Sequence, residues 1–74
     1  MELTENEYHI LESIDSGQAE IGMSLSSLID FCEFNFNANP KPLIDVGYIE
    51  INPDLNGLTT KGKEALKAYY NKRI

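Results

Sequence analysis

Apolar residues in the first half of the chain recur at the three- and four-residue spacing of helices that bury one face. The first apolar stripe consists of Ile10, Leu11 and Ile14. The second consists of Leu25, Leu28, Ile29 and Cys32. Polar residues between these positions, including Ser13, are expected to face solvent. The pattern therefore predicts two amphipathic helices joined by a polar linker.

Capping residues set the ends of these two helices. Thr4 and Glu7 have the spacing of a capping box, in which each side chain accepts a hydrogen bond from the other residue's amide. The first helix is predicted over residues 5–16, with Gly17 as its left-handed C-terminal cap. The second helix is predicted over residues 24–32, because Ser24 is a good N-cap residue.

The segments beside the second helix allow more than one interpretation. Residues 18–23 are predicted to be a linker, in which residues 21–23 would add one short strand. Residues 33–42 begin with alternating Phe and polar residues, which fits a short extended segment. Pro40 and Pro42 are tolerated only in the first turn of a helix. We therefore expect a third, short helix from Pro40 to about Val46, with Asn39 as its N-cap.

The last third of the chain combines strand, turn and helix signals. Residues 48–51 alternate and contain β-branched and aromatic side chains, which favours a strand. Residues 52–57 carry Asn-Pro and Asn-Gly, which predict a loop, and residues 58–59 would return as a second strand. A final helix is predicted from Thr59 or Thr60. Its apolar face would consist of Ala65, Leu66, Tyr69 and Tyr70.

Length and composition predict one small domain over residues 1–74. A chain of this size has a small stability margin, and a single cysteine cannot form an internal disulfide. The lone cysteine, the lack of a secretory signal and the lack of a long apolar run lead us to expect a cytoplasmic protein that does not enter membranes.

Charge is distributed unevenly along the chain. Residues 1–40 contain eight carboxylates and no Lys or Arg, whereas residues 41–74 contain six basic residues and four carboxylates. The net charge is −6. An acidic face repels phosphates and attracts basic partners, although acidic residues also serve solubility alone.

Three stretches of the sequence together resemble small winged helix-turn-helix proteins of the MarR and PadR families and phage-derived winged-helix domains. They are residues 3–11 (LTENEYHIL), residues 47–50 (GYIE) and residues 58–66 (LTTKGKEAL). The resemblance covers nearly the whole chain. It implies an α+β fold that is mostly helical, with three helices, a two- or three-stranded antiparallel wing and a C-terminal helix.

The resemblance also implies a DNA-binding transcriptional regulator, whose third helix enters the major groove while the wing touches the backbone. The candidate DNA contacts are Asn37, Asn39, Lys41, Lys61 and Lys63. The sequence departs from the family pattern in its short third helix and in the acidic residues around it. These are Asp30, Glu33 and Asp45.

The alternative is an acidic protein-binding module that does not bind DNA, such as a phage-type inhibitor, an adaptor or an anti-CRISPR-like DNA mimic. Its candidate contacts are Glu5, Glu12, Asp30, Glu33, Tyr69 and Tyr70. The C-terminal helix would also offer a homodimer interface through its two tyrosines. A third interpretation is a winged-helix piece that mediates assembly within a larger complex.

The sequence offers little catalytic or metal-binding chemistry. Residues 52–57 match the first half of a calcium loop, but Lys63 occupies the position of the bidentate acid, so a plain hairpin is the preferred interpretation. His9 lacks partners for catalysis and would form a surface hydrogen bond with Glu5 or Glu12. Cys32 lies on a core face. We therefore expect no enzyme, no cofactor, no metal and no small-molecule substrate.

Overall fold

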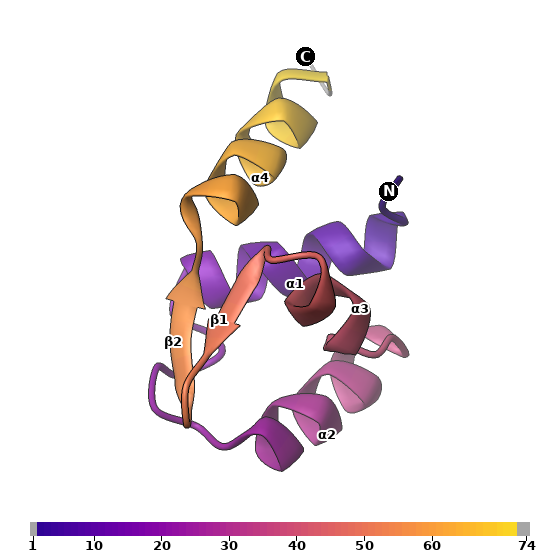
Figure 1. Cartoon of the computed structure of the whole chain (residues 1–74). Helices are drawn as coiled ribbons and strands as arrows, with labels where there is room; N and C mark the ends of the chain where they lie inside the picture. Colours follow the sequence, from indigo (N-terminus) through magenta and orange to yellow (C-terminus); the bar gives the residue numbers. More distant parts are fainter. Residues whose placement is uncertain (1, 73–74) are drawn as a thin grey trace.

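The computed structural model describes residues 2–72, which form four helices and one two-stranded antiparallel sheet (Figure 1). In chain order the elements are α1 (Glu5–Asp15), α2 (Leu25–Phe36), α3 (Lys41–Asp45), β1 (Ile49–Ile51), β2 (Leu55–Leu58) and α4 (Thr60–Lys72). The predicted α+β class, with mostly helical structure and a small hairpin before the last helix, is confirmed. The sheet has two strands rather than three within the described residues.

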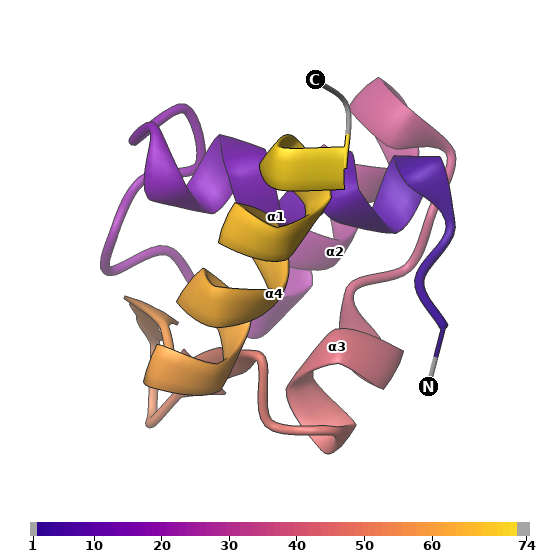
Figure 2. The ribbon, with the colours of Figure 1, turned by 90° about the horizontal axis from the view of Figure 1, so that it is seen from above.

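Helix α1 is the centre of the molecule, because α2, α4 and β2 all pack against it. Figure 1 shows α1 between α4 above and α2 below, and Figure 2 shows α4 crossing over α1. The predicted capping box starts the helix: the amide of Thr4 donates to Glu7 Oε1 at 2.9 Å, and the amide of Glu7 donates to Thr4 Oγ1 at 3.2 Å. Gly17, with φ of 87°, follows the end of α1 in the predicted left-handed conformation.

The core gathers apolar side chains from every helix and both strands. Its buried members are Leu3, Ile10, Leu11, Ile14, Ala19, Leu28, Cys32, Leu43, Ile49, Leu55 and Leu66. The expectation that Ser13 faces solvent was wrong, since Ser13 is only 1% exposed. Its hydroxyl donates to the carbonyl oxygen of Ile10 at 2.7 Å, and this bond allows a small polar side chain to be buried.

Helix α2 is one turn longer than the sequence pattern predicts, and the extended segment after residue 32 was wrong. Phe36 turns inward and meets the ring of Phe31 edge-on, with 5.9 Å between centroids. Phe34 turns outward, so the alternation that suggested a strand marks two faces of a helix. Asn37, with φ of 51°, then ends the helix in a left-handed C-cap.

The hairpin also differs from the prediction, because β2 begins at Leu55 within the expected loop. Ile51 pairs with Leu55 and Glu50 pairs with Gly57, which leaves Asn56 as the extra residue of a β-bulge. Leu55 is buried, and that burial outweighs the turn preference of Asn-Gly. Residues 52–54 therefore form the hairpin turn, and residues 55–57 belong to β2 rather than to the predicted loop.

The linker before α2 contains no strand, although it lies beside the start of β2. The amide of Gly22 donates to the carbonyl oxygen of Leu55 at 2.8 Å. The amide of Leu55 donates to the carbonyl oxygen of Met23 at 2.9 Å. The prediction of a short strand over residues 21–23 was therefore wrong, since only these two backbone bonds join the linker to the sheet. They hold Ile21 beside the hairpin.

Helix α3 spans only Lys41–Asp45, and Pro40 rather than Asn39 occupies its N-cap position. Asn39 still serves the helix start, because its Oδ1 accepts from the amide of Lys41 at 2.9 Å. Leu43 is fully buried and anchors this helix to the core. Ile44 is partly buried against the same core, and Pro40 before the helix is fully buried.

Candidate interaction surfaces

Two of the three stretches on which the winged-helix resemblance rests, residues 47–50 and residues 58–66, meet at the junction between α3 and α4. We call residues 46–48, after α3, and residues 59–62, at the start of α4, the α3–α4 junction. The Thr59 hydroxyl donates to the carbonyl oxygen of Gly47 and accepts from the amide of Gly62 at 3.0 Å. Thr59, rather than Thr60, is therefore the residue whose side chain caps α4.

Gly62 is required at this junction because no side chain fits there. A Cβ added to Gly62 would lie 2.1 Å from the carbonyl oxygen of Tyr48, a distance that real Cβ atoms essentially never show. The first turn of α4 thus packs directly on the backbone that leads into β1.

Lys61 belongs to the same junction. Its Nζ donates to the carbonyl oxygen of Val46 at 2.9 Å and lies 5.2 Å from the centroid of the Tyr48 ring. Val46 is the C-cap of α3, so the ammonium group sits where the helix dipole favours positive charge. These contacts with Val46 and Tyr48 therefore account for the position of Lys61 in the structure.

The five candidate DNA contacts come from the end of α2, the connection to α3, α3 itself and α4. Asn37 and Asn39 serve as helix caps. Lys41 is exposed at the start of α3, whereas Lys61 reaches the other end of that helix. Lys63 follows Lys61 by two residues, which turns it by about 200° around the axis of α4.

The acidic candidates divide into two groups, the first of which lies at the contact between α1 and α4. The Tyr69 hydroxyl donates to Glu5 Oε1 at 3.0 Å, and the Tyr70 hydroxyl donates to Glu12 Oε2 at 2.6 Å. Tyr8 also stacks on Tyr69, with 4.1 Å between ring centroids. These four candidates, Glu5, Glu12, Tyr69 and Tyr70, are brought together and bond to one another within the chain.

The same region includes the titration of Tyr70 and the surroundings of His9. The bond to Glu12 is the largest cause that raises the pKa of Tyr70 to about 12, followed by partial burial. The surface bond expected between His9 and Glu5 or Glu12 is not present in the described part of the chain; instead the His9 ring lies near Phe36, with 6.1 Å between centroids.

Cys32 is fully buried in the core, as its position on the apolar face predicts. Burial raises the pKa of its thiol to about 11, which keeps it protonated near neutral pH. Among the described residues, no group of three or more His, Cys, Asp and Glu side chains has the arrangement of a metal site.

The second acidic group lies on α2 and includes a residue that sequence reasoning did not select. Asp30 is a helical neighbour of both Glu33 and Phe34, since it precedes them by three and four residues. All three are exposed, and Phe34 is 90% exposed. We call these three residues the α2 outer face. Leu28, Cys32 and Phe36 follow one another at four-residue intervals on the inner face of α2. If the predicted helix had been extended along this spacing, Phe34 would have been placed on the exposed face.

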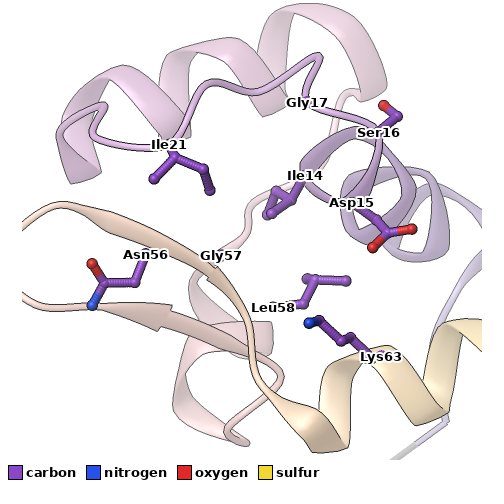
Figure 3. Close-up of a pocket in the computed structure, with 9 residues that line it drawn as sticks. All are labelled: Ile14, Asp15, Ser16, Gly17, Ile21, Asn56, Gly57, Leu58 and Lys63. Carbon is purple, nitrogen blue, oxygen red and sulfur yellow. The ribbon is translucent and has the colours of Figure 1, made fainter.

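Two hollows lie near the end of α1, against β2 and α4. The larger, of about 340 Å³, has apolar walls from Ile14, Ile21 and Leu58, with Asp15 and Lys63 at its rim (Figure 3). The smaller, of about 230 Å³, shares Asp15 and Lys63 and continues along α4 to Tyr70. We call the two together the α1–α4 hollow.

Comparisons with known protein families, curated proteins and solved structures found no match. The chain is thus described by its own geometry, a four-helix α+β domain with a two-stranded hairpin. No helix within residues 2–72 is long and apolar enough to cross a membrane.

Proposed function

We propose that this chain is a non-enzymatic protein-binding module that presents the α2 outer face to its partner. The observation that carries the proposal is the 90% exposure of Phe34 next to Asp30 and Glu33. An aromatic side chain of this kind removes 150–250 Å² of surface from water when a partner covers it, and aromatic residues are common binding hot spots.

Charge defines the chemistry of the partner. Residues 1–40 contain no Lys or Arg, so the α2 outer face lies in a segment whose formally charged side chains are all carboxylates. Exposed carboxylates around an apolar anchor complement a pocket with a basic rim, and they accelerate encounter with it. The partner is therefore a basic protein surface with an apolar pocket.

The placement of the candidate DNA contacts supports protein binding over DNA binding. A DNA-binding helix needs several phosphate contacts that converge on one groove. Here Lys61 bonds to the end of α3, Lys63 lies on another side of α4, and Asp45 is exposed on α3 itself. Lys41 alone remains as an exposed cation at the start of that helix.

The proposal can be tested by selecting peptides from a displayed random library against the immobilised protein. We expect selected peptides to combine Lys or Arg with aliphatic or aromatic residues, and to bind less tightly as salt rises. Phe34→Ser should weaken their binding by roughly thirtyfold, the loss typical of a hot-spot aromatic. Leu25→Ser is the control, because Leu25 is also an exposed apolar residue but lies at the other end of α2.

Two outcomes would contradict the proposal. The first is a set of selected peptides without basic residues, or with equal affinity for Phe34→Ser and the parent protein. The second is salt-steep binding of duplex DNA, measured by fluorescence anisotropy, that Lys41→Glu abolishes. That result would support a DNA-binding regulator instead.

A further inference from the structure

The α1–α4 hollow is large enough to receive an aromatic side chain. A cavity of about 150 Å³ holds a benzene ring, and the larger hollow has about 340 Å³. Figure 3 shows Ile14, Ile21 and Leu58 around this space. Three apolar side chains are therefore available to contact a ring that arrives from outside, beside the polar groups of Asp15, Ser16, Asn56 and Lys63.

The side of the hollow formed by α4 is basic. Lys63 lines both parts, and Lys67 lines the smaller one. The α4 residues that line the hollow are Lys63, Leu66, Lys67 and Tyr70, so both charged side chains on this side are cations. Asp15 adds one negative charge from α1. A ligand with carboxylates on the side that meets α4 would therefore be favoured.

The chain itself carries a ligand of this description, namely the α2 outer face, on which Asp30 and Glu33 lie to one side of Phe34 around the helix. Phe34 cannot reach the hollow of its own molecule by a local adjustment. It lies nine residues beyond Leu25, the first residue of α2, which is about 14 Å along the helix axis. The linker with Ile21, which borders the hollow, precedes that first residue.

We propose that the α1–α4 hollow binds the α2 outer face of a second copy of this chain. Phe34 of one copy enters the larger hollow of the other, while Asp30 and Glu33 face Lys63 and Lys67. This inference rests on the proposed function, because it uses the same α2 surface and names its partner. The two surfaces differ, so copies join head to tail, and the assembly closes as a ring or two-fold pair or extends as a chain.

Charge reversal tests this arrangement directly. The double variant Asp30→Lys/Glu33→Lys disables one surface, and the double variant Lys63→Glu/Lys67→Glu disables the other. Sedimentation velocity over a concentration series should show association of the parent protein and at least tenfold weaker association of each variant alone. An equimolar mixture of the two variants should associate again, because each disabled surface then meets a complementary one.

Two controls separate this contact from general charge effects and from other dimers. Glu2→Lys/Asp45→Lys changes the net charge as much as Asp30→Lys/Glu33→Lys does, at exposed sites that line neither part of the α1–α4 hollow, and it should leave association within twofold of the parent. Tyr70→Ser tests the expected dimer through the C-terminal helix. Circular dichroism confirms that each variant is folded.

Three results would overturn the inference: a parent protein that stays monomeric at the highest concentration, a mixture that does not associate, or association lost in Tyr70→Ser but kept in both charge-reversed variants. None of these contradicts the proposed function, which the peptide selection tests separately. Conversely, restored association of the mixture would support the second copy as partner even if no basic peptide is selected.

Discussion

The α3–α4 junction and the α2 outer face are opposite kinds of surface in one small domain. At the junction, Thr59, Lys61 and Gly62 contact the backbone of residues 46–48. On the α2 outer face, Phe34 is 90% exposed. Thr59, Lys61 and Gly62, which belong to the stretches that carry the winged-helix resemblance, thus stabilise the fold, whereas the α2 outer face lies outside those stretches.

The largest expected effect is at the junction, for Gly62→Ala. On an exposed helix this change would stabilise by about 1 kcal/mol. Here the added Cβ would lie 2.1 Å from the Tyr48 carbonyl oxygen. To relieve this clash, the backbone at Tyr48 or the start of α4 would have to move. We expect the free energy of unfolding to fall by about 3 kcal/mol, as for severe overpacking.

Urea denaturation followed by circular dichroism would measure this loss. Ala68→Gly, at an exposed position of the same helix, is the control and should cost about 1 kcal/mol. If Gly62→Ala stabilised the protein instead, the close approach of α4 to Tyr48 would be refuted.

Thr59→Val should have the next largest effect, because it removes the hydroxyl and keeps the shape. The variant loses the bond to Gly47 and the cap on the amide of Gly62. We expect a loss of about 2 kcal/mol in the free energy of unfolding. Thr60→Val is the matched control and should lie within about 0.5 kcal/mol of the parent. Equal losses in the two variants would show that Thr59 has no special role.

The contact between α1 and α4 lies between these extremes, since Tyr70 bonds to Glu12 but is 39% exposed. Its pKa is about 12 in the folded chain and about 10 in the unfolded chain. Between these pH values the unfolded state has released a proton that the folded state retains. The contribution of Tyr70 is therefore complete below pH 10 and decreases as pH rises toward 12.

Denaturation midpoints across this alkaline range would measure the decrease, which Tyr70→Phe should make shallower. Tyr48→Phe is the control for the loss of one phenol. Solvent screening at a residue this exposed makes the effect smaller than that of Thr59→Val. An identical slope in the parent and in Tyr70→Phe would show that the bond to Glu12 adds no stability.

Local signals in the sequence predicted local structure well. The Thr4–Glu7 box and the Ser24 cap depend on residues within one turn, and both are present. The start of β2 could not be read in this way, because Leu55 is fixed by burial and by bonds to Gly22 and Met23, more than thirty residues earlier in the chain.

The candidate sites were less predictable than the fold, because their use depends on which elements approach one another. Lys61 resembles a free cation in sequence, yet it bonds to Val46, fifteen residues away. Glu5 and Glu12 bond to tyrosines near the other end of the chain. Asp30 and Glu33 were predicted as contacts from charge alone, and Phe34 joins them only once α2 is known to continue to Phe36.

Phe34→Ser should have the smallest effect on stability and gives the sharpest test of the contrast between the two regions. Since Phe34 is 90% exposed, we expect the free energy of unfolding to change by no more than about 0.5 kcal/mol. Phe36→Ser, two residues away, should cost about 3 kcal/mol, because that ring is partly buried against the core and packs on Phe31. If urea denaturation showed equal losses of unfolding free energy in the two variants, the Phe34 ring would contribute to the stability of the fold. That result would contradict the proposal that the α2 outer face is a binding surface.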